Sequence, residues 1–345
     1  MLFFSFLFYL KIPVCLIFTL RFYYIISRVV VYISKELNIG ERMQNFVELG
    51  KKIYDLNNIR EAHRFVVFVT RCTFNAGKMR RVIKFFQSSE LLSKVAETFP
   101  FVYEQPTRAF FYNHSTFEER ITLIEEHMSF LQSNLKSEIV EAIYSNKPLS
   151  LWHMDLDDEF KSMELVMSIE SGQRKEGLLS LLLRLKNNKP LYQIMFWIAK
   201  DKSDDWAMWI GALQGPNMED AKDVVKKITK KCHAYRTKNL ILYAAQAVSR
   251  NLDLKKIYAV TNEGYYANNH VRIDRKLKTS FSDFWLEAGG RHTDDERFDL
   301  LPLTEIRKSA EEIPTRKRAV YRRRFELLDE IDSTIGERIK NILRN

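Results

Sequence analysis

The chain has 345 residues, of which 46% are hydrophobic, 28% charged and 13% aromatic. The low totals of glycine (11) and proline (8) exclude collagen-like and linker-like chains. The hydrophobic fraction excludes wholesale disorder, because it supplies enough apolar surface to bury against the entropy of ordering the chain. The formal net charge of +10 predicts attraction to anionic partners.

The first 42 residues form a hydrophobic N-terminal segment rich in Phe, Leu, Ile, Tyr and Val. Charges such as Arg21 and Arg28 interrupt its apolar runs, whereas a membrane-spanning helix needs about 18 or more apolar residues with few charges. No basic stretch precedes the run and no A-x-A-like site follows it, which argues against a cleaved signal peptide. Two interpretations remain open: a membrane anchor that leaves the following chain in the cytoplasm, or translated upstream sequence with the true start at Met43.

The three cysteines, Cys15, Cys72 and Cys232, contain no C-x-x-C pair and give neither a disulfide framework nor a zinc site. We interpret them as small buried hydrophobic residues in a protein of a reducing compartment. The acidic run from Asp155 to Glu159 lacks the glycine-centred spacing of a calcium loop and is interpreted as a solvated turn. The sequence therefore predicts no metal site.

Residues 43–147 have a helical pattern, clearest from Ser115 to about Leu135. Ser115 and Glu118 match the S-x-x-E capping box that begins a helix. A buried stripe then recurs at helical spacing: Phe117, Ile121, Ile124, Met128 and Leu131. His127 lies off that stripe and is interpreted as a structural histidine.

Residues 148–303 predict an α/β core. Five short apolar runs at hairpin spacing are typical of an antiparallel meander: 150–156, 163–170, 177–185, 191–199 and 207–214. They are followed by a helix capped by Asn217, a second, mostly apolar helix from Asn239 to Arg250, a strand from Lys256 to about Thr261, and a last strand from Phe298 to Leu303. The fold class is therefore α+β: an N-terminal helical region, a mostly antiparallel sheet with packed helices, and a basic C-terminal helix.

The tail, residues 304–345, is predicted to be helical and carries a basic cluster. Its members are Arg316, Lys317, Arg318, Arg322, Arg323 and Arg324. Such a run is either a solvated helix face or a binding surface for the phosphate groups of lipid, nucleotide or nucleic acid. No recognition-helix or RNP-type signature accompanies it, so the sequence disfavours nucleic acid as a partner.

The candidate site lies in the loop between the two helices that follow the meander. This loop brings His233, Tyr235, Arg236 and Lys238 directly before the helix that begins at Asn239. Free N–H groups at a helix N-terminus attract anions, and the two cations add charge-assisted hydrogen bonds. We expect a phosphate-bearing ligand there, with His233 as the catalytic proton carrier. The alternative is a basic connecting loop in which His233 caps a helix.

The stretch from Leu191 to about Asp329 resembles the bacterial VirK/YbjX family, and the helical part around residues 107–131 fits the same family. The segments that carry the resemblance are IGALQGP (210–216), HAYRTKNLILYAAQA (233–247), IYAVTN (257–262), FWLEAGG (284–290) and RKRAVYRRRFELL (316–328). The resemblance implies a bacterial protein linked to virulence and cell-envelope function, including resistance to host antimicrobial peptides. It implies no established catalytic activity.

The order of elements is also similar to GNAT-type acyltransferases, in which a loop binds the pyrophosphate of acyl-CoA. By position, Asn262 matches the strand-end asparagine of that family, and Phe284-Trp285 with the following Gly-Gly matches its aromatic–glycine motif. Two departures weaken the likeness. The loop has no glycine that would let a backbone approach pyrophosphate, and Trp285 replaces the tyrosine that protonates the leaving thiolate, a role an indole cannot fill.

Two hypotheses follow. The first is an acyltransferase that modifies an envelope component, with acyl-CoA or acyl-carrier protein as donor, held by Tyr235, Arg236, Lys238 and Asn262. The second is a non-enzymatic accessory or regulatory protein that binds an anionic membrane surface or a partner through the basic cluster. Both predict a cytoplasmic protein, associated with or anchored in the inner membrane. The sequence gives no oligomeric state.

Overall fold

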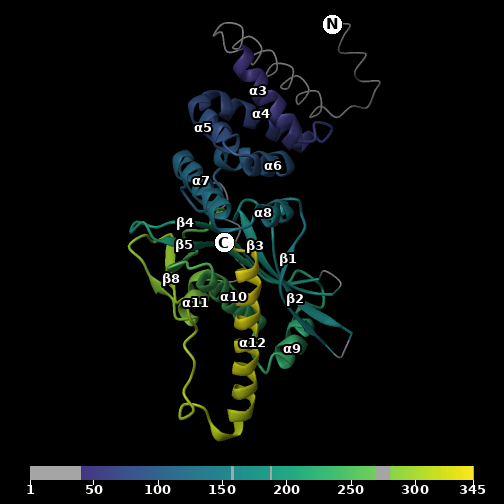
Figure 1. Cartoon of the computed structure of the whole chain (residues 1–345), viewed down its shortest axis with the longest axis vertical. Coiled ribbons are helices and arrows are strands. Elements are labelled where there is room, and N and C mark those ends of the chain that lie inside the picture. Colours follow the sequence, from purple (N-terminus) through teal and green to yellow (C-terminus); the bar gives the residue numbers. More distant parts are fainter. Residues whose placement is uncertain (1–39, 157–158, 187–188, 269–279, 345) are drawn as a thin grey trace, which may run out of the picture. The chain divides into compact units, whose positions relative to one another are not determined.

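The computed structural model describes residues 40–156, 159–186, 189–268 and 280–344 (Figure 1). The predicted hydrophobic N-terminal segment lies outside these residues except for its last three, so both interpretations of it stay open. Within the part of the chain that is described, no helix is both long and apolar enough to cross a membrane. The contacts between residues divide the chain into two compact units, residues 1–77 and 78–345, and each unit is described by itself below.

In the first unit, α3 (Gly40–Ile53) packs against α4 (Ile59–Phe74). Asn58 caps α4, because its side chain accepts hydrogen bonds from the backbone N–H groups of Arg60 and Glu61. The rings of Tyr54 and Phe68 meet across the two helices, with centroids 5.8 Å apart.

The second unit opens with helices, as predicted for this region. They are α5 (Ala76–Phe86, which begins in the first unit), α6 (Glu90–Thr98), η1 (Pro100–Tyr103), η2 (Gln105–Thr107), α7 (Phe117–Asn134) and α8 (Ser137–Tyr144). The capping box of α7 is formed by Thr116 and Glu119, so the prediction of Ser115 and Glu118 was wrong by one residue. Both pairs match the same pattern, but the Ser115 hydroxyl donates to the Phe110 carbonyl and is not available to α7.

The described strands form one eight-stranded sheet in the order β1-β2-β3-β4-β5-β6-β8-β7. The predicted meander is confirmed as β1 (Leu149–Asp155), β2 (Ser162–Ser168), β3 (Leu179–Leu185), β4 (Pro190–Lys200) and β5 (Trp206–Gln214), which pair antiparallel in sequence. The remaining strands are β6 (Lys256–Val260), β7 (Arg291–His292) and β8 (Phe298–Leu301). The pair β5–β6 is parallel and the others are antiparallel, which confirms the α+β class.

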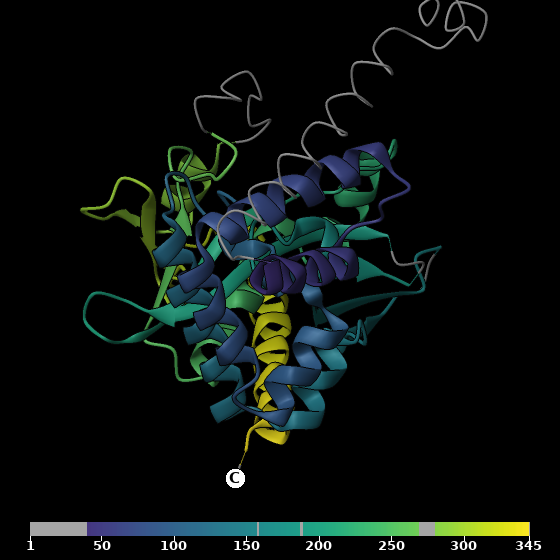
Figure 2. The same cartoon turned by 90° about the horizontal axis from the view of Figure 1, so that it is seen from above.

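The remaining helices pack on this sheet or beside it. They are η3 (Ser171–Gln173), α9 (Ala221–Lys231), α10 (Thr237–Asn251), α11 (Phe281–Glu287), η4 (Thr315–Lys317) and α12 (Arg318–Ile342). The helix α10 is buried on nearly all sides, as its apolar sequence predicted, and α12 packs along it (Figures 1 and 2). Residues 304–314 are not helical, contrary to the prediction. Pro314 disfavours helical conformation at Ile313, and Arg307 donates to the Asp329 carboxylate of α12 (2.6 Å), a contact that periodicity does not report. The helix α9 begins at Ala221 and is not capped by Asn217.

The helix α7 supplies hydrogen-bond acceptors to the part of β4 that extends past the β3–β4 pairing, which ends where Leu179, the first residue of β3, pairs with Phe196. The pairing of β3 with β4 stops at Phe196, while β4 continues to Lys200. Beyond that point the backbone N–H of Ile198 donates to Nδ1 of His127 (3.0 Å), and the N–H of Lys200 donates to the Glu126 carboxylate (3.0 Å). Burial lowers the pKa of the fully buried His127 to about 3, so the ring is neutral. His127 is a structural residue, as the sequence indicated.

Replacing His127 with leucine removes the acceptor of the Ile198 N–H, and we expect the free energy of unfolding to fall by about 1–3 kcal/mol. The pKa of His127 is lower in the folded protein than its ordinary value of 6.5. Between pH 6.5 and about 3 the unfolded chain therefore binds more protons, and wild-type stability falls as the pH falls through that window. Urea unfolding of wild type and His127→Leu at pH 7 and at about pH 4.5 measures both effects, and the variant should show the smaller pH dependence.

The matched control is His153→Leu, because His153 is half exposed on β1. It should change the free energy of unfolding by no more than about 0.5 kcal/mol. Equal stabilities of wild type and His127→Leu at pH 7 would contradict the structural role.

Candidate functional site

The parallel strands β5 and β6 pair over Ala207–Ile210 and Lys256–Ala259. The strand β6 ends one residue later, at Val260, whereas β5 continues alone on this side to Gln214. The connection between them runs through α9 and α10, so the carboxyl end of β5 leads toward the amino end of α10. In open sheets with parallel strands, ligands bind where the carboxyl ends of two such strands part.

A β-bulge at Gly211 marks the point of separation. Ile210 pairs with Phe196 and Ala212 with Met195, which leaves Gly211 as the extra residue of β5. Bulges bend a strand and increase its twist, and they are frequent beside active sites. A Cβ at Gly211 would lie 1.9 Å from the carbonyl oxygen of Glu176, so the loop before β3 reaches β5 only because this residue is glycine.

The carboxylate of Glu176 connects the two separated strands. Glu176 is 3% exposed. One of its carboxylate oxygens accepts a hydrogen bond from the Tyr265 hydroxyl (2.7 Å), beyond the end of β6, and the other accepts one from Gln214 Nε2 (2.8 Å) at the end of β5. Burial raises the pKa of Glu176. A buried carboxyl group with a raised pKa, placed where two strands part, is a candidate general base.

Sequence reasoning missed Glu176, and no local signal could have found it. The residue stands in a turn that was recognised only by its flanking glycines, and its partners are far along the chain, at Gln214 and Tyr265.

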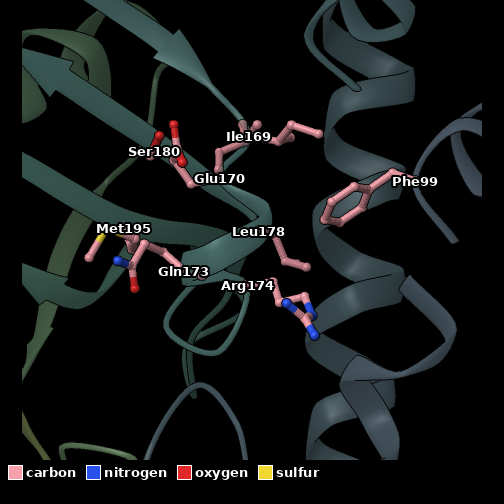
Figure 3. Close-up of a pocket in the computed structure, with 10 residues that line it drawn as sticks. Phe99, Ile169, Glu170, Gln173, Arg174, Leu178, Ser180 and Met195 are labelled. Atoms are coloured by element: carbon pink, nitrogen blue, oxygen red, sulfur yellow. The ribbon is translucent and has the colours of Figure 1, made fainter. Parts of the chain in front are cut away.

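The loop that carries Glu176 is firmly anchored. Figure 3 shows Arg174 and Leu178 facing Phe99 across a small cavity. Arg174 Nε donates to the buried Glu104 carboxylate (2.7 Å), and its guanidinium lies 4.1 Å from the centroid of the Phe101 ring. The cavity of about 10 Å³ has room for about one water molecule, so it is a packing defect rather than a ligand site.

The predicted phosphate loop lies between α9 and α10. His233 (φ 51°) and Ala234 (φ 61°) have left-handed backbone conformations that end α9. Arg324 holds this turn, because its Nε and Nη2 atoms donate to the His233 carbonyl (3.2 and 3.1 Å) and Nη2 also donates to the Ala234 carbonyl (3.1 Å). The side chain of His233 is partly exposed.

Arg236 and Lys238 both face α11. Arg236 forms an ion pair with Glu287, and both side chains are more than half exposed. Lys238 Nζ lies 3.8 Å from the centroid of the Phe284 ring, and burial, followed by the charge of Arg236, lowers the pKa of Lys238. The first turn of α10 also holds two buried polar atoms without a hydrogen-bond partner, Thr237 Oγ1 and Asn239 Oδ1. An anion at this helix end would therefore find two cations and the Thr237 hydroxyl as a free donor, whereas Asn239 Oδ1, which only accepts hydrogen bonds, would not contribute.

The other two predicted ligand-binding residues have structural partners. The Tyr235 hydroxyl donates to the Glu305 carboxylate (2.5 Å). Asn262 ties the end of β6 to the start of α11, since its Oδ1 accepts from the Phe281 N–H (2.8 Å) and its Nδ2 donates to Ser280 Oγ (3.0 Å). Contact of either side chain with a ligand stays a prediction.

The basic cluster lies at the start of α12 and is largely exposed. Arg316, Lys317, Arg318, Arg322 and Arg323 are exposed. Arg324 differs from them, because its guanidinium is bound to the end of α9 and lies 4.2 Å from the centroid of the Tyr321 ring. The cluster therefore combines an exposed cationic surface with one structural arginine.

The described cysteines and carboxylates form no metal centre. Cys72 and Cys232 are buried free thiols, and burial raises the pKa of Cys232 to about 12, so neither the position nor the protonation suits a ligand. Among the residues that the structure describes, no group of three or more His, Cys, Asp or Glu side chains is arranged to hold a metal ion.

These features define an α+β protein whose sheet opens between two parallel strands beside a basic helix end. The chain belongs to the family described as "Protein of unknown function (DUF535)", whose model matches residues 57–337.

Relatives with curated sequences confirm the resemblance to VirK/YbjX proteins. The chain is 32% identical to "Uncharacterized protein YbjX" of Escherichia coli K12 over 218 residues, which are 62% of this chain and 64% of that protein. It is 27% identical to an uncharacterised protein of Haemophilus influenzae over 78% of this chain and 87% of the relative. It is also 30% identical to "Membrane protein LapB" of Mannheimia haemolytica, over 32% of this chain and 48% of that protein.

The packing of the Glu176 carbonyl on Gly211 predicts that Gly211→Ala is strongly destabilising. A methyl group there would overlap the carbonyl oxygen at 1.9 Å, and overpacking of this kind costs about 1–3 kcal/mol or more. The matched control is Gly172→Ala, in the loop that carries Glu176, because a Cβ at Gly172 would have nothing within 4 Å. Thermal unfolding of the two variants measures the difference, and equal melting temperatures would exclude the close contact.

Proposed function

We propose that the protein is a GNAT-type acyltransferase that takes its acyl group from a phosphate-bearing donor, acyl-CoA or acyl-carrier protein. The observation that supports the proposal is the end of the β5–β6 pairing beside the Gly211 bulge, where β5 continues past the last residue of β6. A thioester inserted between two parting strands can reach an acceptor on the other face of the sheet while its phosphates remain at the helix end. This order of elements matches the resemblance to GNAT proteins seen in the sequence.

The donor phosphates would be bound by Arg236, Lys238 and the free N–H groups of the first turn of α10. Arg236 is available for this, because its present partner Glu287 is itself exposed and can be displaced. The absence of glycine from the loop favours contact through side chains rather than close approach of the backbone.

The transfer itself requires a base at the acceptor. An acceptor hydroxyl or amine attacks the thioester carbonyl, the C–S bond breaks, and the thiolate leaves and takes up a proton. We assign the removal of the acceptor proton to Glu176, because its buried carboxylate lies between the separated strands. His233, at the amino end of α10, stays the predicted source of a proton for the thiolate. The envelope association of VirK/YbjX proteins supports an acceptor in the cell envelope.

Calorimetric titration with acetyl-CoA, octanoyl-CoA and an acyl-carrier protein tests donor binding. Arg236→Ala and Lys238→Ala should each weaken the affinity about tenfold, because each removes a charge-assisted contact to phosphate. Glu287→Gln should tighten binding, since it releases Arg236 from its ion pair. Glu176→Gln should bind the donor normally but transfer no acyl group.

The control for charge is Lys255→Ala, because Lys255 is exposed and pairs only locally with Asp253. No binding of any of the three donors would remove the proposal. Equal affinities of wild type and both cation variants would place the donor elsewhere.

A second function is supported by the exposed part of the basic cluster. Arg316, Lys317, Arg318, Arg322 and Arg323 present five cations at the start of α12, which suits an accessory protein on an anionic membrane surface at the cytoplasmic side of the inner membrane. The name of the LapB relative also favours a link with membranes.

Sedimentation with vesicles tests this second function. The protein should pellet with phosphatidylglycerol vesicles at low salt, and should be released by about 0.5 M NaCl, because salt screens exposed charges. Neutralising the five exposed cations to glutamine, with Arg324 kept for its structural contacts, should abolish pelleting, since each contributes about 1 kcal/mol. The control neutralises five exposed lysines elsewhere: Lys52, Lys84, Lys147, Lys189 and Lys255. Equal pelleting of the two variants would contradict a specific surface.

A further inference from the structure

The face of the sheet opposite α10 carries a row of stacked aromatic rings. Ser249 of α10 contacts Met208, so the next residue of β5, Trp209, points to the opposite face. Trp209 lies beside Trp197 of β4 and Tyr258 of β6 in the strand register. The ring centroids are 6.3 Å apart for Trp197 and Trp209, at an angle of 6°, and 4.2 Å apart for Trp209 and Tyr258, at 17°.

Two further rings extend the row. Tyr112 stacks on Trp197 with centroids 6.1 Å apart. Phe298 of β8 meets Tyr112 and Trp209 edge-on, at 5.2 and 4.9 Å. Trp209 and Tyr258 are partly exposed, whereas Trp197 is buried. The row therefore has a rigid buried end and an accessible end.

Two adjoining cavities lie over these rings and share Trp209, Asp295 and Phe298. Their volumes are about 320 and 410 Å³. Pockets that hold small molecules are typically about 300–1,000 Å³ in volume. We call the two cavities together the aromatic cleft.

The rim of the aromatic cleft carries both signs of charge. Its carboxylates are Glu118, Glu119, Glu126, Asp201, Asp294 and Asp295, and its cations are Lys200, Lys202, Arg291 and Arg297. Many of these groups are held in place by neighbours. Asp295 binds the Arg297 guanidinium through both of its oxygens (2.9 and 2.8 Å), and Asp201 accepts from the Tyr258 hydroxyl (3.0 Å).

This charge pattern decides which ligand suits the aromatic cleft. The Arg297 guanidinium lies 4.9 Å from the centroid of the Tyr112 ring, so a native cation already occupies one cation–π position beside the row. The more numerous carboxylates repel an anion. Several of them are already paired with native cations, Glu118 with Arg81, Asp201 with Lys256 and Asp295 with Arg297, so little free negative charge is left to attract a further cation. A neutral ring with many hydroxyl groups meets neither penalty, because hydroxyls donate to carboxylates and accept from guanidinium and ammonium groups.

We propose that the aromatic cleft is a carbohydrate-binding site. Trp209 and Tyr258 stack on each other with centroids 4.2 Å apart, so the C–H face of a pyranose ring packs on an outer π face of this pair, where the negative π surface attracts C–H groups. The hydroxyl groups exchange hydrogen bonds with the rim, Asp295 and Arg297 in particular. The inference goes beyond acyl transfer and does not depend on it, because it concerns binding alone.

Saturation-transfer NMR tests the proposal on the wild-type protein. Irradiation of aromatic protons should transfer magnetisation to the ring protons of at least one sugar among glucose, galactose, N-acetylglucosamine and their disaccharides, with affinity on the order of 1 mM. Adenosine, spermidine and methyl phosphate are the comparison ligands for planar, cationic and anionic chemistry; for adenosine, whose own ring protons are aromatic, the methyl protons of the protein are irradiated instead. No transfer to any sugar at about 20 mM, or saturable binding of a comparison ligand in place of a sugar, would overturn the proposal.

Variants locate the site. Trp209→Leu should weaken sugar binding about tenfold, because it removes the stacking surface, whereas Trp209→Phe should retain part of the affinity. Tyr321→Leu, which removes an aromatic ring on α12 outside the aromatic cleft, should bind as wild type does. If Trp209→Leu does not fold, Asp295→Asn gives the same test through the rim. Equal affinities of Tyr321→Leu and the cleft variants would place the sugar elsewhere and overturn the assignment.

Discussion

The end of the hydrogen-bonded ladder between β5 and β6 is the constraint on which the candidate site depends. Parallel pairing covers four residues and ends beside the bulge at Gly211, where β6 stops at Val260 and β5 continues to Gln214. Backbone groups released in this way need new partners or a ligand, because unsatisfied buried groups are costly. The space is shared by the loop at Glu176, whose carbonyl oxygen approaches β5 where glycine offers no side chain. A buried carboxylate is thereby placed between Gln214 at the end of β5 and Tyr265 beyond the end of β6.

The ladder of hydrogen bonds between β3 and β4 ends in a different way. Where β3 stops, α7 supplies the acceptors for the next two outward N–H groups of β4 through His127 and Glu126. Side chains of the helix α7 thus take the place of a neighbouring strand along the last residues of β4. One ladder is followed by side chains that complete the hydrogen bonds of the strand that continues. The other ends beside a bulge, where β5 runs on past β6 next to the candidate site.

Much of the fold could be predicted from the sequence, because periodicity reports burial directly. The five meander strands and the buried helix α10 were found from short apolar runs and from the apolar faces of residues 239–250. The loop at His233 was also located, since its composition is unusual. The basic cluster was found, although no pattern distinguished Arg324 from its neighbours.

The features that the sequence did not reveal depend on register and on distant partners. The row of Trp197, Trp209 and Tyr258 exists only because three strands align these residues side by side. The carboxylate of Glu176 finds its hydrogen-bond partners, Gln214 and Tyr265, 38 and 89 residues further along the chain. The capping box was displaced by one residue because Ser115 satisfies a loop carbonyl instead, a competition that a local motif does not report.

The contacts of Arg324 have a consequence for regulation. Its guanidinium joins the start of α12 to the carbonyl groups that end α9, directly before the loop of Arg236 and Lys238. Adsorption of the neighbouring cations on a charged surface, and occupation of the helix end by an anion, would thus act on one shared turn. Thermodynamic linkage requires that, if either event alters the geometry of this turn, each changes the affinity of the other by the same factor. Through Arg324, binding at the basic cluster of α12 and binding at the loop of Arg236 and Lys238 would then be coupled.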